Sequence, residues 1–140
     1  MNTLDLTPLR NALASLDATL ALLDEPGLAT RPAHQDAFRA AAIQKFEFTY
    51  EVAWKMLRRR LTLDAADPDS VTGMPFADLI RTGADRGLLR KGWPAWRAFR
   101  EARAITGDTY DAAKAALVLE RIPAFREEAA FLLARLEAPA

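Results

Sequence analysis

The sequence predicts an all-α protein, an antiparallel up-and-down bundle of four long helices plus one short helix. Apolar residues recur at intervals of three and four along the long segments, which is the period of a helix with one buried face. No alternating run rich in Val, Ile or Thr is long enough to predict a strand. Clusters of proline and glycine separate the segments. The 140 residues are expected to form one helical-bundle domain, 1–140, with a single core.

The first helix is expected to begin with Thr7 as its N-cap and Pro8 at the first helical position. Its buried face is a leucine seam made of Leu9, Leu13, Leu16, Leu20 and Leu23. Glu25-Pro26-Gly27 is expected to stop this helix. A connector that contains Pro32 follows, and the central helix is expected from about Gln35 to Leu63.

The apolar face of the central helix is unusually wide. It covers about half of the circumference, which is broader than the ~100° stripe of an ordinary surface helix. Its members are Ala42, Ile43, Phe46, Tyr50, Val52, Ala53, Met56, Leu57 and Leu61. This helix should therefore be covered on two sides. Its polar side chains form a narrow stripe on the opposite side: Gln44, Glu47, Glu51, Lys55 and Arg58. The stripe is either a solvated face, with Glu51 and Lys55 paired at the i,i+4 spacing, or one wall of a polar groove.

The remaining segments alternate between helices and turns. Arg58-Arg59-Arg60 near the end of the central helix either complements the helix dipole or forms a phosphate-binding patch. Residues 65–74 are rich in Asp, Pro and Gly and are predicted as a loop. A short helix is expected to begin at Pro75, and Gly87 is expected to be its left-handed C-cap.

Two more helices complete the predicted bundle. One begins at Gly92-Trp93-Pro94 and ends at Thr106-Gly107. The last begins at 108–111 and runs to about Glu137. Because Pro123 cannot donate a backbone hydrogen bond, a kink or break is expected just before it.

Composition excludes several classes of function. Apolar residues make up 51% and charged residues 27%, a balance typical of soluble globular proteins. Nineteen basic and nineteen acidic side chains leave no overall positive field to attract nucleic acid. With no cysteine and a single histidine, His34, the sequence predicts no disulfide, no metal site and no cofactor. The N-terminus does not resemble a signal peptide, and no segment approaches the ~20 apolar residues of a membrane span. A cytoplasmic location without membrane attachment is expected.

One constellation could carry chemistry. Arg103 is followed, after four residues, by Asp108-Thr109-Tyr110 at the break between the last two helices. The planar fork of an arginine can hold a phosphate or carboxylate, and a helix start presents free N–H groups to anions. Asp108 is either the N-cap of the last helix, reinforced by Asp111, or part of such a site. Tyr110 is expected to be partly buried, with its hydroxyl at the rim.

The central helix resembles the hallmark of the nucleotidyltransferase substrate-binding protein family. The run that carries the resemblance is Ile43-Gln44-Lys45-Phe46-Glu47-Phe48-Thr49-Tyr50-Glu51-Val52-Ala53-Trp54-Lys55, where the family reads close to IQRFEFTFELAWK. Further matches are Pro75, Ile80-Arg81, Gly87-Leu88-Leu89, Trp96, Phe99, Arg103 and Thr109-Tyr110-Asp111. The resemblance covers about residues 9–136.

The resemblance implies a self-associating helical bundle of the wider HEPN group. Such proteins are similar to the helical substrate-binding domain of kanamycin nucleotidyltransferase, but are separate polypeptides. The implied partner is a separately encoded minimal nucleotidyltransferase that carries the metal-binding catalytic residues. Some relatives are ribonuclease toxins that use an Arg, a spacer of four to six residues and a His. In those pairs the transferase neutralises the toxin, in some cases by adenylylating the tyrosine two positions after the His.

This sequence departs from that pattern at its decisive positions. Arg103 is present and Tyr110 matches the modifiable tyrosine, but the Asn, Ser and His of the family's motif are Ala104, Gly107 and Asp108. An exposed aspartate is ionised at neutral pH and can only accept a proton, whereas a histidine can shuttle one. Its charge would also repel RNA phosphates. Metal-independent RNA cleavage is therefore not expected of this chain.

The leading hypothesis is a non-catalytic substrate-binding subunit. It would form a homodimer, as its aromatic content and wide apolar arc suggest, and pair with a separate minimal nucleotidyltransferase in a toxin–antitoxin-like system. The predicted substrate-binding residues are Gln44, Glu47, Glu51, Trp54, Lys55, Arg103 and Tyr110. Arg103 would bind an anionic group of a nucleotide or small-molecule acceptor, and Tyr110 is also the candidate modification site. The alternative is a HEPN-type ribonuclease toxin with an altered site of Arg103 and Asp108. A third interpretation is a structural dimer whose sites have decayed.

Overall fold

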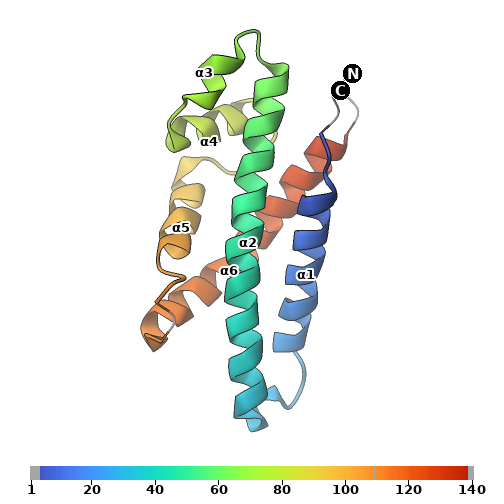
Figure 1. The fold of residues 1–140 in the computed structure, drawn as a ribbon. Helices are drawn as coiled ribbons and strands as arrows, with labels where there is room; N and C mark the ends of the chain where they lie inside the picture. Colours follow the sequence, from blue (N-terminus) through green and yellow to red (C-terminus); the bar gives the residue numbers. More distant parts are fainter. Residues whose placement is uncertain (1–3, 109, 139–140) are drawn as a thin grey trace.

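Six α-helices and one 3-10 turn make up residues 4–108 and 110–138, the part of the chain that the computed structural model describes (Figure 1). They are α1 (Thr7–Leu23), the turn η1 (Leu28–Thr30), α2 (Pro32–Asp64), α3 (Pro68–Thr72), α4 (Phe76–Asp85), α5 (Trp93–Ala104) and α6 (Ala112–Glu137). No strand occurs in these residues, so the predicted all-α bundle is confirmed. None of the described helices combines the length and the apolar character that crossing a membrane requires.

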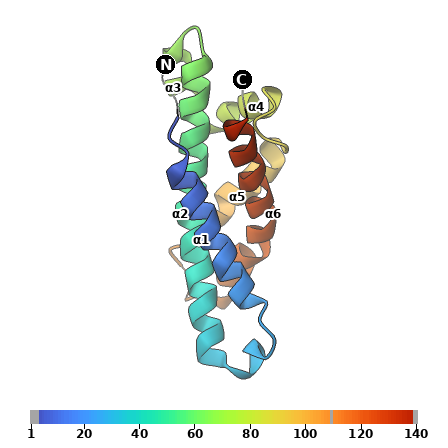
Figure 2. The same ribbon diagram turned by 90° about the vertical axis from the view of Figure 1, so that its right-hand side faces the viewer.

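Helix α2 is the long central member of the bundle, and the other helices are arranged around it (Figures 1 and 2). α1 packs antiparallel along α2, and α3 and α4 lie beside the end of α2. α5 runs back on the side of α2 away from α1, and α6 crosses behind α2 to finish beside the start of α1. An ion pair of 3.0 Å between Arg10 and Glu137 joins α1 and α6 at that end.

Phe125 of α6 is the centre of the hydrophobic core. Its side chain is completely buried. Its ring centroid lies 5.1 Å from that of Phe46, 5.5 Å from that of Phe99, and 6.1 Å from those of Tyr50 and Trp96. Most of these pairs meet edge to face, the geometry that aromatic rings prefer. Since the five rings come from α2, α5 and α6, this cluster fixes those three helices to one another.

The start of α1 differs from the prediction. Thr7 is the first helical residue rather than the N-cap, because Leu6 before it already has a helical backbone, with φ −91° and ψ −1°. The Asp5 carboxylate accepts a hydrogen bond of 3.0 Å from the Thr7 backbone N–H instead. The leucine seam packs as expected: Leu9, Leu13 and Leu16 are buried, and Leu20 and Leu23 are partly buried against the core.

Two further predictions need correction, and one is confirmed. The segment 65–74, predicted as a loop, contains α3, which begins at Pro68 and buries Val71 against the core. Of the kink or break expected before Pro123, the break is absent, since α6 is continuous from Ala112 to Glu137. Pro123 is exposed, whereas Ile122 and Phe125 on either side are fully buried, so core packing holds both halves in one helix. Gly87 has φ +74°, the predicted left-handed conformation.

Helix α4 packs closely on α2 because Gly83 has no side chain. A Cβ atom at this position would lie 3.0 Å from Cδ1 of Leu57 and 3.2 Å from Cδ1 of Leu89. Both leucines belong to the core, so neither can move away freely. The glycine thus sets how near α4 comes to α2.

Candidate functional site

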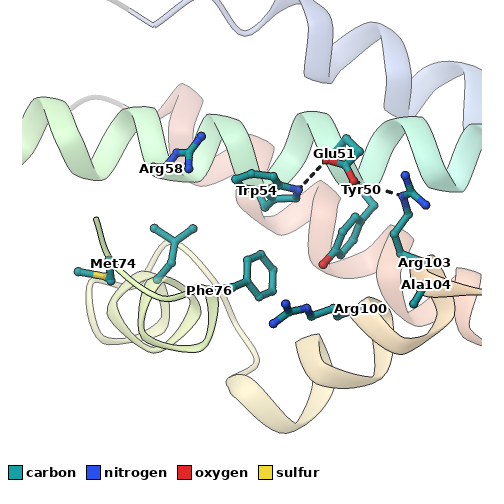
Figure 3. A pocket seen from close by; sticks show the side chains of 10 residues that line it. Tyr50, Glu51, Trp54, Arg58, Met74, Phe76, Arg100, Arg103 and Ala104 are labelled. Atoms are coloured by element: carbon teal, nitrogen blue, oxygen red, sulfur yellow. Dashed lines mark hydrogen bonds and ion pairs between the residues drawn. The ribbon is translucent and has the colours of Figure 1, made fainter. Parts of the chain in front are cut away.

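A cavity of about 460 Å³ opens between α2, α4 and α5 (Figure 3). Its lining residues are Tyr50, Glu51, Trp54, Arg58, Met74, Phe76, Leu79, Arg100, Arg103 and Ala104. Small-molecule sites commonly have volumes of about 300–1,000 Å³. Two further grooves, of about 450 and 330 Å³, lie beside α1. Neither is lined by any of the predicted substrate-binding residues. Lys45 and Thr49, which belong to the run that resembles the family, line the smaller groove. We therefore take the first cavity as the candidate site.

Helical spacing explains why these side chains meet. Tyr50, Trp54 and Arg58 follow one another at intervals of four along α2, so they share one face of that helix. Arg100 and Arg103 lie three residues apart on α5 and face the same space (Figure 3). Helix α4 supplies the third wall. The site therefore depends on the way α4 and α5 pack against α2.

Glu51 organises one wall of the cavity. Its Oε1 accepts a hydrogen bond of 3.2 Å from Nε of Arg103, and its Oε2 accepts one of 3.0 Å from Nε1 of Trp54 (Figure 3). Nη2 of Arg103 also lies 3.4 Å from Oε1 of Glu47, and its Nη1 donates to the Thr106 hydroxyl at 3.2 Å. The Arg103 guanidinium is thus already neutralised by two carboxylates of α2. It joins α5 to α2 rather than standing free for an anion.

Tyr50 belongs both to the core and to the cavity, although its spacing in the sequence predicted only a core position. Its ring is buried in the core, at 4% exposure, but its hydroxyl points into the space between Phe76 and Arg100 (Figure 3). The hydroxyl is not among the buried polar atoms that lack a partner, and it is open to the cavity that Tyr50 lines. Burial disfavours the phenolate and raises the pKa of Tyr50 to about 12. The hydroxyl is therefore protonated, and able to donate, throughout the physiological range.

Two arginines of the cavity face aromatic rings. Cζ of Arg58 lies 4.8 Å from the Trp54 ring centroid, and Cζ of Arg100 lies 5.2 Å from that of Phe76. These distances are typical of cation–π contacts. In the described part of the chain, neither guanidinium forms an ion pair with a carboxylate. Sequence reasoning did not select Arg100, although its i,i+3 spacing to Arg103 was a usable signal.

The predicted stripe of α2 is only partly inside the cavity. Glu51 and Arg58 line it, whereas Gln44 and Lys55 are exposed outside it. Nζ of Lys55 lies 3.9 Å from Oε2 of Glu51, so the expected pair exists but is long. Glu47 touches the site only through Arg103. Part of the stripe is therefore a solvated face, and the other part is one wall of a groove.

The segment between α5 and α6 lies apart from the cavity. Asp111, not Asp108, is the N-cap of α6, because its Oδ1 accepts hydrogen bonds from the backbone N–H groups of Ala113 and Lys114 at 2.9 and 3.2 Å. Asp108 accepts a bond of 2.7 Å from Nζ of Lys114, and this hydrogen bond raises the pKa of Lys114. Tyr110 is fully exposed rather than partly buried, and it does not line the cavity. Thr109 lies outside the described residues.

No metal ligand set is evident in the described residues. Within 4–108 and 110–138, no group of three His, Asp or Glu side chains lies close enough to hold an ion. The cavity combines aromatic walls, three guanidinium groups, one carboxylate and one hydroxyl. These groups can bind and orient a polar ligand through hydrogen bonds and stacking.

Residues 4–138 match the family described as nucleotidyltransferase substrate binding protein like, and the chain belongs to this family. It is 42% identical over 102 residues to a probable ribonuclease HepT of Haemophilus influenzae, a match that covers 73% of this chain and 69% of that protein.

Two solved structures are similar to this fold. One is HI0074 of Haemophilus influenzae, described as having the fold of a substrate binding domain of a nucleotidyltransferase. It matches with a TM-score of 0.90 and 36% identity over 96% of this chain and all of that one. The other is a protein of Thermus thermophilus, with a TM-score of 0.70 and 29% identity over 93% of this chain and 99% of that one. These matches bear out the family resemblance predicted from the central helix.

Proposed function

We propose that this chain is a non-catalytic substrate-binding subunit that works with a separate minimal nucleotidyltransferase. Family membership supports this, as does the likeness to HI0074, whose fold is described as that of a substrate-binding domain. The observation that carries the proposal is the cavity between α2, α4 and α5. It gathers Glu51, Trp54 and Arg103, three of the predicted substrate-binding residues, around a space of about 460 Å³.

In this division of labour the transferase holds the nucleoside triphosphate and its metal. An oxygen of the acceptor attacks the α-phosphorus and pyrophosphate leaves. This chain contributes by orienting the acceptor, which turns an encounter between two free molecules into a reaction within one complex. Arg103 is a positioning residue here, because its contacts with Glu47 and Glu51 hold α5, and with it Arg100, against α2.

Substitution of Arg103 tests this role. We expect Arg103→Ala to reduce transfer by about tenfold or more, since a hydrogen bond to a charged group contributes roughly 1.5–3 kcal/mol. Transfer of labelled nucleotide from ATP into the small molecules of a cell extract is the measurement, made with the transferase that copurifies with the protein. Arg97→Ala is the matched control, because Arg97 lies on the same helix, is exposed and pairs only with Glu101 among the described residues. Full transfer by an assembled Arg103→Ala complex would show that Arg103 is not needed at the site.

The chain is also proposed to form a homodimer. Phe48 supports this because its phenyl ring is 59% exposed in the middle of α2, where a second copy of the chain packed along this helix would bury it. Sedimentation of the purified protein should show a dimer, and Phe48→Ser should shift it toward the monomer. A wild-type protein that remains monomeric at high micromolar concentration would contradict the proposal.

We also propose that this chain and its transferase form a toxin–antitoxin-like pair, in which Tyr110 is modified. The full exposure of the Tyr110 side chain supports it as a modification site, because a partner enzyme could reach the hydroxyl without unfolding the bundle. In that step the Tyr110 oxygen would attack the α-phosphorus of ATP and release pyrophosphate. Mass spectrometry of the protein purified with its transferase would locate an added adenylyl group at Tyr110 or show none there.

The second candidate function is a HEPN-type ribonuclease, which the 42% identity to a probable ribonuclease HepT favours. Two observations weigh against it. Asp108 stands at the position of the family's histidine and is held by Lys114, and Arg103 is held by Glu47 and Glu51. RNA cleavage by the purified wild-type protein that disappears in Arg103→Ala would establish the ribonuclease instead.

A further inference from the structure

We propose that the cavity between α2, α4 and α5 binds a small aromatic phosphate monoester, with its phosphate between Arg100 and Tyr50 and its ring along Phe76 and Trp54. This assignment rests on the proposed function in one respect only, that the cavity is the acceptor site. A nucleoside 5′-monophosphate is a representative of this ligand class.

The charges that line the cavity favour an anion. Three arginines and one glutamate line it, which is a local excess of positive charge in a chain whose net charge is zero. Glu51 is engaged by Arg103, so the unpaired positive charge belongs to Arg58 and Arg100. A phosphate monoester carries about −1.5 to −2 charges at neutral pH, so Arg100 attracts it more strongly than it attracts a carboxylate, and the charge of Arg58 at the far end of the cavity adds to this field.

The position of Arg100 leaves its hydrogen-bond donors available. Its guanidinium lies over the Phe76 ring, with Cζ 5.2 Å from the ring centroid. A cation–π contact uses no N–H group, so the donors of Arg100 stay available to bind a phosphate in a bidentate way. The Phe76 ring thus orients Arg100 without consuming its donors.

The Tyr50 hydroxyl provides a second donor at the same end of the cavity. It points between Phe76 and Arg100 (Figure 3). The Tyr50 hydroxyl is not among the buried polar atoms that lack a partner, so it is open to the cavity and can donate to an acceptor atom of a ligand there. A phosphate oxygen held by Arg100 would supply that acceptor.

The rest of the cavity suits a flat apolar body. Between Arg100 and Arg58 lie Trp54 and Phe76 (Figure 3), and Met74 also lines the cavity. The Trp54 and Phe76 rings meet edge to face at 5.9 Å and form a corner, which a planar ring can contact from the cavity side. Arg58 at the far end offers donors to acceptor atoms on the ring of the ligand. A phosphate-binding arginine at one end of the cavity and a donor to the ring edge at the other together favour a heteroaromatic monophosphate as the ligand.

Calorimetric titration of the purified chain, without any transferase, tests this assignment. The probes are AMP, adenosine and inorganic phosphate. We expect AMP to bind more tightly than either fragment, because only AMP fills both ends of the cavity. Arg100→Gln should weaken AMP binding by about tenfold or more, and Tyr50→Phe by several-fold. Arg97→Gln is the matched control on α5 and should bind AMP as the wild type does.

Three results would overturn the assignment. They are no AMP binding at millimolar concentration, equal binding of AMP and adenosine, and unchanged AMP binding by Arg100→Gln. Arg100 is exposed, so its substitution should leave the fold intact, and circular dichroism checks this. Because the titration needs no partner, its failure is distinguishable from a failure of the proposed pairing, which would appear as the absence of a bound transferase.

Discussion

Phe125→Ala is expected to lower the free energy of unfolding by about 3–5 kcal/mol, the range for deleting a buried aromatic ring from a packed core. Phe125 is completely buried and contacts rings from α2 and α5. Its removal leaves a cavity at the junction of three helices, where none of them can move in without losing its other contacts. Urea denaturation followed by circular dichroism measures the change.

Phe38→Ala is the matched control for this prediction. Phe38 lies on α2, is partly exposed, and has its ring centroid 6.2 Å from that of His34. Removing this ring should lower the free energy of unfolding by less than about 1 kcal/mol, because no cavity forms in the core. Equal losses for the two variants would mean that the aromatic cluster is not the centre of stability.

Glu128→Ala is expected to destabilise the protein by a similar amount, about 3–5 kcal/mol, for a different reason. Glu128 is a completely buried carboxylate of α6. Its Oε1 accepts hydrogen bonds from the Lys91 backbone N–H at 2.9 Å and from Nε1 of Trp96 at 3.3 Å. Truncation leaves both donors without a partner and opens a cavity. Since Lys91 lies just before α5, it should also loosen the helix that carries Arg100.

Two variants separate these effects in the same denaturation experiment. Glu128→Gln keeps an oxygen at the position of Oε1, and Oε2 has no partner among the described residues. The free energy of unfolding of this variant should therefore fall by less than about 1.5 kcal/mol. Glu127→Ala, one position away on the surface, should change stability by about 0.5 kcal/mol at most. If Glu128→Ala behaved like Glu127→Ala, the buried carboxylate would not hold the start of α5.

Local patterns were sufficient to predict most of the fold. The three-and-four spacing of apolar residues identified the long helices, and Gly87 marked the turn after α4 because its positive φ favours glycine. The errors arose where tertiary contacts decide. Pro123 stays within α6 because the core residues beside it are buried, and α3 forms where Val71 packs on the core. Neither effect is visible in a window of neighbouring residues.

The candidate site could be predicted only in part. The motif on α2 and the arginine on α5 pointed to Glu51, Trp54 and Arg103, which meet in the structure. Spacing placed Tyr50 in the core, which is correct for its ring but does not reveal where its hydroxyl points. Phe76 depends on how α4 packs across α2, and no local pattern encodes that.

The measurement that tests the central claim most directly is an affinity pull-down of the tagged protein from its own cell extract, expressed at its native level. Bound proteins are identified by mass spectrometry and quantified against the bait. Our account predicts that a small nucleotidyltransferase is recovered in near-stoichiometric amount. Recovery of the chain alone, under conditions that preserve other known complexes of the same extract, would contradict the claim that it is the substrate-binding subunit of a two-chain enzyme.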